Sequence, residues 1–563
     1  MRWTLKPKPE VDKLASLHES LLVDEVVATL LLQRGIETYE AAKTFFRPSF
    51  DHLHDPFLMK DMVQAVTRIE QALSNNENIL VFGDYDVDGT SSVALMSTYL
   101  KTRTEQVATY IPDRYDEGYG VSIKGIDFAH DNDFSLIIAL DCGVKAIDKV
   151  AYAKEKGIDF IICDHHRPGK ELPNAVAILD PKRDDCNYPF KELCGCGVGF
   201  KLIQALAFNE GKPVEELTEY LDLVATAIGA DIVPIVGENR VLAYLGLVVI
   251  NTNPRPGIKA IINQVKKAEL TITDVVFIVA PRINAAGRMK HGNYAVTLLS
   301  ETDFDLAETY AEEIEAFNTD RREADQRITD EALQQIKNNK EHEGFTTVVY
   351  HETWHKGVIG IVASRLIETY YRPTLVFTKS GDKLAASARS VSGFDVYNAL
   401  EACSEHIEQF GGHKYAAGLT LKEENYEAFK QAFEDEVSRT IDKHLLVPEI
   451  KVDLQIDLSQ VDGKLWRIIS QFAPFGPGNM TPIFMSENIK DTGYGKCVGE
   501  DDKHLRITVT QTGREKLVCI GFNLGNKLGL IKDKNLFKAV YSIDENHWQG
   551  ITSLQLKLRD IRE

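Results

Sequence analysis

The sequence lacks any uninterrupted apolar stretch long enough to cross a membrane. A helix that spans a bilayer needs about 18 or more apolar residues in a row, and no run in this chain reaches that length. Residues 1–7 also lack the apolar core of a signal peptide. We therefore expect a cytoplasmic protein that does not insert into a membrane.

The sequence has few cysteines, and none of them form a Cys-x-x-Cys pair. There are 8 cysteines in 563 residues, and Cys142 and Cys163 lie in apolar runs where reduced core thiols are expected. Cys186, Cys194 and Cys196 are close together, which leaves a zinc knuckle open, although their spacing fits no common zinc pattern.

The sequence also has no surplus of basic charge. Lysine and arginine number 64 against 84 aspartate and glutamate residues, which gives a formal net charge of −20. An acidic chain does not attract nucleic acid at long range. Any binding to DNA or RNA must therefore depend on a local basic groove, and it should weaken steeply with salt.

Short apolar runs alternate with amphipathic helical stretches between residues 78 and 235. The runs lie at residues 79–82, 136–140, 160–163 and 175–179. This alternation predicts a parallel sheet with helices on both faces. In such folds, ligands bind beyond the carboxyl ends of the strands.

The remaining segments predict further parts of an α/β protein, without internal repeats or low-complexity tracts. We expect helices over residues 1–75, a long charged helix over residues 303–340, and a second α/β lobe with strands near residues 346–350 and 374–377. Strand-like alternation over residues 450–563 predicts a small β-barrel of the oligonucleotide-binding (OB) type.

Acidic residues and histidines follow three of the predicted strands. Asp84, Asp86 and Asp88 follow the first run, Asp141 follows the second, and a later strand ends in Asp164-His165-His166. Carboxylate oxygens together with imidazole nitrogens suit a pair of Mn²⁺ or Mg²⁺ ions better than zinc or a lone calcium. A metal pair in an α/β chain indicates hydrolysis of a phosphate ester.

Two other interpretations of the acidic run remain open. An EF-hand loop also begins with Asp-x-Asp-x-Asp-Gly, but it needs glutamate at its twelfth position, where this chain has Leu95, and a helix before it. A solvated acidic turn is the second interpretation.

Asp231 closes an apolar stretch at residues 223–230, which is typical of a buried helix that ends in a turn. A buried carboxylate is costly unless it is paired or bound to metal; the alternative is an ordinary helix-end aspartate. His165 and His166 are adjacent, so they point in different directions. One can therefore ligate a metal while the other faces a substrate.

Eight segments together resemble a known superfamily. They lie at residues 83–89, 141–143, 164–166, 230–234, 281–288, 354–360, 411–413 and 474–479. The first four resemble the DHH phosphoesterase superfamily, and the others resemble its single-stranded-DNA-specific exonuclease family. The resemblance extends from about residue 20 to residue 560.

The resemblance implies two α/β lobes, a DHH domain with a parallel sheet and a DHH-associated domain, joined by a long helix and followed by an OB-type β-barrel. The expected divisions are an N-terminal helical segment, the DHH catalytic domain, the connecting helix, the substrate-binding DHH-associated domain and the nucleic-acid-binding barrel. Their ranges are residues 1–75, 76–300, 301–342, 343–445 and 446–563, respectively.

The resemblance also implies the chemistry. The chain is expected to be a 5′-to-3′ exonuclease that releases 5′-mononucleotides from single-stranded DNA in recombination and repair, with two Mn²⁺ or Mg²⁺ ions as cofactors. Further expectations are a helicase and a single-strand-binding protein as partners, and a monomeric state. The implied metal ligands are Asp84, Asp86, Asp88, Asp141, His165 and Asp231, and His166 completes the catalytic set by contacting the substrate phosphate or the second ion. Which two of the first three aspartates touch metal stays open.

Basic and glycine-rich segments are expected to hold the substrate. Arg282, Asn284 and Arg288 lie in a segment that the sequence predicts to be a short loop containing glycine, and guanidinium groups bind phosphate oxygens in a bidentate manner. The further candidates are Arg114, Tyr119, Ser387, Arg389, Gly411, Gly412 and His413. Of these, the resemblance implies that Arg114, Tyr119, Ser387 and Arg389 hold the 5′-terminal part of the strand. For each arginine, a surface ion pair is the alternative.

Two other functions remain open at this stage. The first is a different hydrolase of the superfamily, which would act on short oligonucleotides, cyclic dinucleotides or pyrophosphate. The second is a single-strand-binding protein without catalysis, although such a protein would not need carboxylates concentrated against a phosphate backbone.

Overall fold

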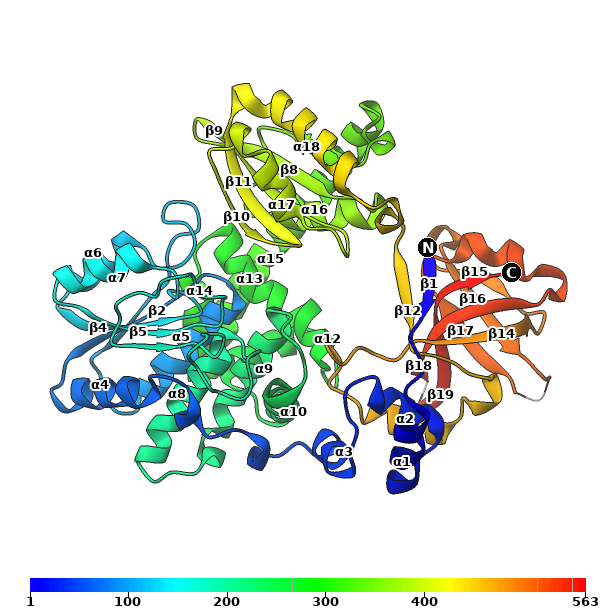
Figure 1. Cartoon of the computed structure of the whole chain (residues 1–563), viewed down its shortest axis with the longest axis horizontal. Helices are drawn as coiled ribbons and strands as arrows, with labels where there is room; N and C mark the ends of the chain where they lie inside the picture. The colour runs from blue at the N-terminus through cyan, green and yellow to red at the C-terminus, as the bar shows by residue number, and fades with distance from the viewer. Residues whose placement is uncertain (266, 514, 549) are drawn as a thin grey trace. The chain divides into compact units, whose positions relative to one another are not determined.

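The computed structural model describes residues 1–265, 267–513, 515–548 and 550–563 (Figure 1). The chain divides into two units. Unit 1 comprises Met1–Arg2, Ile111–Tyr119 and Pro281–Glu449, and unit 2 comprises Trp3–Tyr110, Gly120–Ala280 and Ile450–Glu563. Within the described residues, no helix is both long enough and apolar enough to cross a membrane.

Unit 2 contains the predicted parallel sheet. Its strand order is β3-β2-β4-β5-β6, and all neighbouring strands are parallel. The strands are β2 (Asn78–Gly83), β3 (Val107–Tyr110), β4 (Phe134–Leu140), β5 (Asp159–Cys163) and β6 (Ala177–Leu179). The sequence pattern had predicted each of these except β3, which is short, contains a threonine and is only partly buried, so it forms no apolar run.

Helices cover both faces of this sheet (Figure 1). Successive side chains of a strand point to opposite faces, so Leu80 and Phe82 pack with Ile126 of α6 (Ile123–Asp131) and Val150 of α7 (Ile147–Glu155). Helices α5 (Val87–Lys101) and α8 (Gly195–Asn209) contact strands of the same sheet and pack against each other.

More helices follow the sheet in the chain. They are α9 (Leu221–Ala230), α10 (Gly237–Thr252), α11 (Pro256–Asn263), α12 (Ile272–Asp274), a π-helical turn (Val275–Val279), α13 (Ala280–Met289), α14 (Asn293–Ser300) and α15 (Phe304–Asn338). The last of these is the long charged helix predicted from the sequence.

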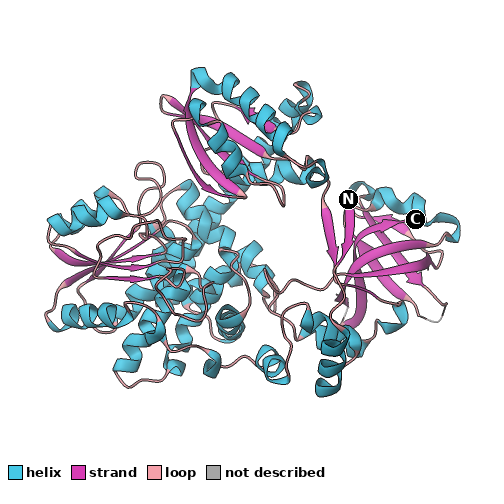
Figure 2. Ribbon diagram, viewed as in Figure 1, coloured by secondary structure: helices cyan, strands magenta, loops and turns pink. Residues whose placement is uncertain are grey.

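The C-terminal part of unit 2 is a seven-stranded sheet of order β13-β14-β18-β19-β17-β16-β15 in which β14 also pairs with β16 (Figure 2). The elements of this region are β12 (Glu449–Val452), β13 (Leu454–Gln455), α19 (Gly463–Ser470), β14 (Phe484–Asp491), β15 (Lys496–Val498), β16 (His504–Thr510), β17 (Leu517–Gly521), β18 (Phe537–Trp548) and β19 (Ile551–Arg562). The extra pairing closes the barrel that the alternating sequence predicted.

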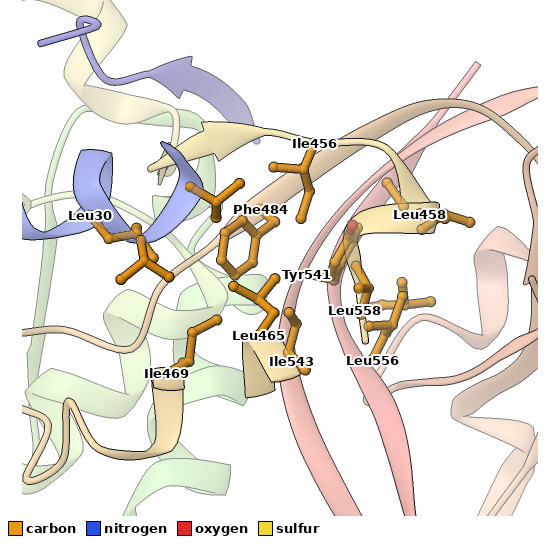
Figure 3. Close-up of a cluster of buried hydrophobic side chains, with 14 of the residues drawn as sticks. Leu30, Ile456, Leu458, Leu465, Ile469, Phe484, Tyr541, Ile543, Leu556 and Leu558 are labelled. Carbon is orange, nitrogen blue, oxygen red and sulfur yellow. The ribbon is translucent and has the colours of Figure 1, made fainter. Parts of the chain in front are cut away.

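The N-terminal helices share a core with this barrel. Leu30 lies in one apolar cluster with Leu465, Phe484 and Tyr541 (Figure 3). The N-terminal elements are β1 (Arg2–Leu5), α1 (Val11–Leu21), α2 (Glu25–Leu32), α3 (Tyr39–Phe46) and α4 (Met62–Ser74). Strand β1, which pairs with β12, is an exception to the helices expected over residues 1–75.

Unit 1 contains the second sheet, of order β10-β11-β9-β8-β7. Its elements are β7 (Thr347–Tyr350), α16 (Ile359–Thr369), β8 (Thr374–Ser380), β9 (Lys383–Arg389), α17 (Val396–Ala402), β10 (Gln409–His413), β11 (Ala416–Lys422) and α18 (Tyr426–Thr440). Strands β7 and β8 coincide with the two strands predicted for this lobe.

Candidate metal centre and substrate-binding residues

The predicted metal ligands of unit 2 gather at the carboxyl edge of the parallel sheet. Asp84 follows β2, Asp141 follows β4 and His165 follows β5, and these three strands are adjacent in the sheet. Asp86 is the N-cap of α5, where its Oδ1 accepts the N–H of Gly89 at 3.0 Å. The element before the acidic run is a strand, which excludes the EF-hand.

His165 lies at the centre of a group of carboxylates. Its Nε2 is 3.2 Å from Oδ1 of Asp141, 3.6 Å from Oδ2 of Asp231 and 3.8 Å from Oδ2 of Asp88. The ligand atoms of Asp88, His165 and Asp231 lie within 4.8 Å of one another, as do those of Asp141, His165 and His166. Side chains from four separate segments therefore converge on one point.

Asp88 also anchors a helix. Its two carboxylate oxygens accept the backbone N–H groups of Gly195 and Cys196, both at 2.7 Å, at the start of α8. A helix N-terminus favours such a carboxylate. A Cβ at Gly195 would lie 2.6 Å from Cβ of Asp141, so the close approach requires glycine.

The cysteines at this helix do not form a zinc site among the described residues. Cys194 caps α8 by accepting the N–H of Gly197, and Cys186, Cys194 and Cys196 are buried free thiols. The two residue groups that could hold a metal contain no cysteine.

The charges of the cluster are those of a cation site. Burial, together with repulsion from Asp86, raises the pKa of Asp88 to about 7, and burial with repulsion from Asp88 raises that of Asp231 to about 8. The pKa of Asp141 also rises well above its ordinary value, mainly through burial. Burial lowers the pKa of His165 to about 3, so its imidazole is neutral and carries a lone pair. Oxygen donors that repel one another around a neutral imidazole fit divalent cations such as Mn²⁺.

His166 is held differently from His165. Burial alone would lower its pKa, but the hydrogen bond from its Nδ1 to Oδ1 of Asp164, at 2.8 Å, outweighs burial and raises the pKa to about 8. Asp164 also accepts backbone N–H groups of Val144, His165 and His166. Asp164 therefore positions the histidine loop and keeps His166 ready to carry a positive charge.

The expectation that Arg282, Asn284 and Arg288 lie in a loop is wrong, because all three lie on helix α13. Pro281 has no N–H to donate to the preceding turn, and the helix accommodates it after a π-helical turn instead of ending. Arg282 forms the ion pair that was its alternative, with Nε 2.7 Å from Oε2 of Glu315. Asn284 and Arg288 are four residues apart and share a helix face.

Arg288 belongs to a basic cluster around Tyr115 in unit 1. Its Nη1 donates to the carbonyl of Gly357 at 3.0 Å, and the Tyr115 hydroxyl donates to the carbonyl of Arg288. Burial raises the pKa of Tyr115, and the positive charges of Arg114 and Arg288 oppose that rise. Tyr119 is 53% exposed in the same loop as Arg114.

The other candidates for substrate binding lie on β9 and β10 of unit 1, which are separated in the sheet by β11. Across the sheet, Ser387 of β9 lies opposite Gly418 of β11, which lies opposite Gly411 of β10. In the same way, Arg389 lies opposite Ala416, which lies opposite His413. The candidates Ser387 and Arg389 lie in β9, and Gly411 and His413 lie in β10. Gly411 and Gly412 are exposed, and a Cβ at Gly412, whose φ is +142°, would lie 2.4 Å from the carbonyl oxygen of Ala416.

Arg389 reaches the first turn of α16. A Cβ at Gly360 would lie 3.0 Å from Nη2 of Arg389 and 3.3 Å from Oγ of Ser387. Burial lowers the pKa of the Arg389 guanidinium, although arginine stays charged at neutral pH. A half-buried guanidinium beside a helix N-terminus is a favourable place for an anion.

Asp164 was expected only as a member of the Asp-His-His motif and without a role of its own. Gly195 and Tyr115 were not among the expected site residues. Nothing in the sequence indicates that the amide of Gly195 meets Asp88, because 107 positions separate the two residues.

Family models match three parts of the chain. The model described as "DHH family, N-terminal domain" matches residues 78–228, the "DHHA1 domain" matches residues 343–439, and the "RecJ OB domain" matches residues 452–560.

Curated relatives match over almost the whole chain. The single-stranded-DNA-specific exonuclease RecJ of Bacillus subtilis (strain 168) is 37% identical over 100% of this chain and 70% of the relative. The enzyme of the same name from Escherichia coli (strain K12) is 33% identical over 98% of each chain.

Solved structures of the same kind share the fold. RecJ from Thermus thermophilus in complex with Mn²⁺ matches with a TM-score of 0.85 and 25% identity, over 100% of this chain and 79% of that chain. A second structure, an exonuclease RecJ bound to manganese, matches with a TM-score of 0.61 and 31% identity, over 69% of this chain and 97% of that chain.

Proposed function

This chain belongs to the RecJ family of DHH phosphoesterases, and from that premise we propose that it is a single-stranded-DNA-specific exonuclease that degrades its substrate from the 5′ end. The products are 5′-mononucleotides, and the enzyme acts in DNA recombination and repair. The two relatives that are named single-stranded-DNA-specific exonuclease align with at least 98% of this chain.

One observation of the site carries the proposal. The neutral imidazole of His165 lies within 3.8 Å of carboxylate oxygens of Asp88, Asp141 and Asp231, which come from three other segments. The neutral His165 cannot neutralise these carboxylates, and the pKa values of Asp88, Asp141 and Asp231 are raised because burial and mutual repulsion disfavour their negative charge. A structural ion pair would place a positively charged side chain at the centre of the carboxylates, whereas a divalent-metal site combines carboxylates with a neutral imidazole.

The metal ions are Mn²⁺ or Mg²⁺, which Asp141, His165, Asp231 and two of Asp84, Asp86 and Asp88 would hold. When bound, a pair of such ions polarises the phosphate and activates a water molecule for in-line attack on phosphorus. His166, whose pKa is raised to about 8, carries a proton at neutral pH and places positive charge at the developing negative charge of the phosphate. Asp164 orients His166 for this role.

The residues of unit 1 hold the 5′ end of the strand. Arg389 and Ser387, with the first turn of α16, supply a guanidinium, a hydroxyl and helix N–H groups to a terminal phosphate. Gly411 and Gly412 leave the strand edge open to the sugar-phosphate backbone, and His413 follows them on β10. Arg114, Tyr119 and Arg288 add positive charge and an aromatic ring that can stack on a base.

The setting of the reaction is part of the proposal. The enzyme works in the cytoplasm as a monomer, receives unwound DNA from a helicase and meets strands coated with a single-strand-binding protein. The eight free cysteines support a reducing compartment.

Digestion of end-labelled DNA tests substrate, polarity and cofactor together. The same single strand is labelled at its 5′ or 3′ end and incubated with and without Mn²⁺, and a duplex serves as the control. We expect labelled mononucleotide at once from the 5′ label, delayed release from the 3′ label, and little release without Mn²⁺ or from the duplex.

Other outcomes would point to the alternative functions. Hydrolysis of dinucleotides at the same rate as long strands would favour a small-substrate phosphoesterase. Tight strand binding without turnover dependent on metal would favour a binding protein. Early release of the 3′ label would contradict the proposed polarity.

A further inference from the structure

The segment that follows Asp231 is conformationally strained. Residues 232–236 connect α9 to α10, and Asp231 stands at the start of this segment as the C-cap of α9. Ile232 has a φ of +59°, a left-handed conformation that is costly for a β-branched side chain. Its side chain is 65% exposed, so its own packing does not impose this conformation. Contacts further along the segment must therefore hold it.

A loop from the C-terminal part of the chain, residues 472–480, packs against this segment, and we call it the brace. The N–H of Ile235 donates to the carbonyl of Pro477 at 2.7 Å. A Cβ at Gly476 would lie 2.6 Å from Cδ1 and 2.8 Å from Cγ1 of Ile235, and one at Gly478 would lie 2.9 Å from Cγ1 of Val236. The brace therefore lies so close to the segment at Gly476 and Gly478 that any residue larger than glycine would force a shift there.

Hydrogen bonds within the brace hold its conformation. Nδ2 of Asn479 donates to the carbonyls of Phe472 and Pro474 at 2.8 and 2.9 Å. The backbones of Gly476 and Asn479 exchange two hydrogen bonds, at 3.0 and 2.8 Å. A turn closed by these four bonds keeps its shape, so it can serve as a fixed surface for Ile235.

Two residues in the first turn of α10 complete the connection. The guanidinium of Arg240, only 4% exposed, donates to the carbonyls of Phe472 at 2.7 Å and Ala473 at 3.0 Å. Asn239 is fully buried, and its Nδ2 donates to the carbonyls of Pro234 and Glu192. Glu192 lies three positions before Gly195, whose amide holds Asp88. The start of α10 therefore links the brace to the segment that carries Asp231 and to the segment whose Gly195 amide binds Asp88.

We propose that the brace, with Asn239 and Arg240, is a positioning device that fixes the carboxylate of Asp231 in the metal centre. The inference rests on the proposed role of Asp231 as a metal ligand. The C-terminal part of the chain would then have a second role, because the brace sets metal affinity in addition to any contact that the barrel makes with DNA. Residues that orient metal ligands commonly change metal affinity or activity about 10- to 100-fold when they are replaced.

The test is the variant Gly476→Ala in the full chain. Its methyl group overlaps Ile235, so the segment must shift and Asp231 with it. We expect the Mn²⁺ dissociation constant, measured by electron paramagnetic resonance of free Mn²⁺, to rise about tenfold or more. At limiting Mn²⁺ the kcat should fall, excess Mn²⁺ should restore it, and KM for single-stranded DNA should stay within about twofold.

A matched control and a compensating variant separate positioning from general damage. Gly463→Ala, at the exposed start of α19 with nothing within 4 Å of the new Cβ, should bind Mn²⁺ like the unmodified protein. In Gly476→Ala/Ile235→Ala, the overlapping atoms are gone and the nearest remaining Ile235 atom, Cβ, is 3.7 Å away. The double variant should therefore bind Mn²⁺ more tightly than Gly476→Ala alone.

Ile235→Val is a milder second variant in case Gly476→Ala does not fold. It removes only the Cδ1 atom that touches the brace, and it should raise the Mn²⁺ dissociation constant by a few-fold. The inference is overturned if the variants that fold bind Mn²⁺ as tightly as the unmodified protein. It is also overturned if Gly476→Ala weakens DNA binding and leaves Mn²⁺ binding unchanged.

Failure of the proposed function gives a different result. If Asp231→Asn binds Mn²⁺ as tightly as the unmodified protein, Asp231 is not a ligand and the premise falls. If Asp231→Asn weakens Mn²⁺ binding but the brace variants do not, only the positioning role is lost.

Discussion

Acidification should weaken Mn²⁺ binding much more than an ordinary carboxylate site would allow. The pKa values of Asp88 and Asp231 are raised to about 7 and about 8 in the metal-free protein. A metal ion binds the ionised carboxylates, so it must displace protons from these groups when the pH lies below their pKa values. Binding should therefore tighten as the pH rises from 6 to 8.

The two pKa values set the size of the effect. A carboxyl group with a pKa of about 8 is about half ionised at pH 8 and about 1% ionised at pH 6, which corresponds to a ~50-fold loss of affinity. A pKa of about 7 gives a further loss of ~10-fold over the same range. Because the two groups repel each other and titrate together, we expect a combined loss of about 10²-fold or more.

Isothermal titration calorimetry provides the assay. Mn²⁺ is titrated into metal-free protein at pH 6, 7 and 8, in two buffers of different ionisation enthalpy, so that proton release is counted with affinity. We expect about one proton or more released at pH 7. The variant Asp231→Asn should show a shallower pH dependence, since one of the two groups is gone.

A dissociation constant that is unchanged between pH 6 and 8, with no proton release, would refute this reasoning. The stability of the metal-free protein should change with pH in the direction opposite to its Mn²⁺ affinity. Because the folded-state pKa values are raised above the ordinary 3.8, the stability that these groups contribute is present at low pH and is lost as the pH rises through about 8. Metal-free protein should therefore lose stability with rising pH, and Mn²⁺ should reverse the loss.

Three further substitutions test other parts of the molecule. Asp141→Ala should abolish turnover at any Mn²⁺ concentration while the circular dichroism spectrum stays unchanged, because a carboxylate at the centre of the site is lost. Arg389→Ala should raise KM about tenfold for 5′-phosphorylated strands and leave 5′-hydroxyl strands unaffected, because a hydrogen bond to a charged phosphate contributes about 1.5–3 kcal/mol. Lys201→Met should lower the free energy of unfolding by about 3–5 kcal/mol, since it leaves the buried Glu238 without its positively charged partner at 3.0 Å.

Each of these predictions has an outcome that would contradict it. Full activity of the Asp141 variant in excess Mn²⁺ would remove that residue from the site, and an equal KM change for both strand ends would remove Arg389 from the phosphate site. For Lys201 the matched control is Lys212→Met, which breaks an exposed pair with Glu210. That control should cost less than about 1 kcal/mol, and an equal loss in both variants would show that burial is not the cause.

Much of the fold could be predicted because its signals are local. An apolar run ends at Phe82, Leu140 and Cys163, and in each case the strand ends there or one residue later, just before an acidic residue. Since strands of a βαβ unit are parallel, their carboxyl ends had to meet at one edge. The expectation of a glycine-containing loop around residues 282–288 was wrong, because these residues continue as helix α13 after a π-helical turn.

The functional roles within the site could be predicted only in part. Residue type and spacing identified the carboxylates and histidines, but they could not separate His165 from His166. The structure separates them, because burial lowers the pKa of one to about 3 and Asp164 raises that of the other to about 8. The ion pair of Arg282 with Glu315 also depends on how two helices pack, which no local pattern encodes.

The sequence by itself determined which elements form and which of them end in acidic residues or histidines, because hydrophobic periodicity and strand-end chemistry are properties of neighbouring residues. Tertiary packing alone decided that Asp88 anchors α8, that Asp231 meets His165, and that Gly476 touches Ile235. These contacts join residues 66 to 241 positions apart. They exist because the burial of apolar faces brings distant segments together, and only then do the distances, charges and pKa values of the site follow.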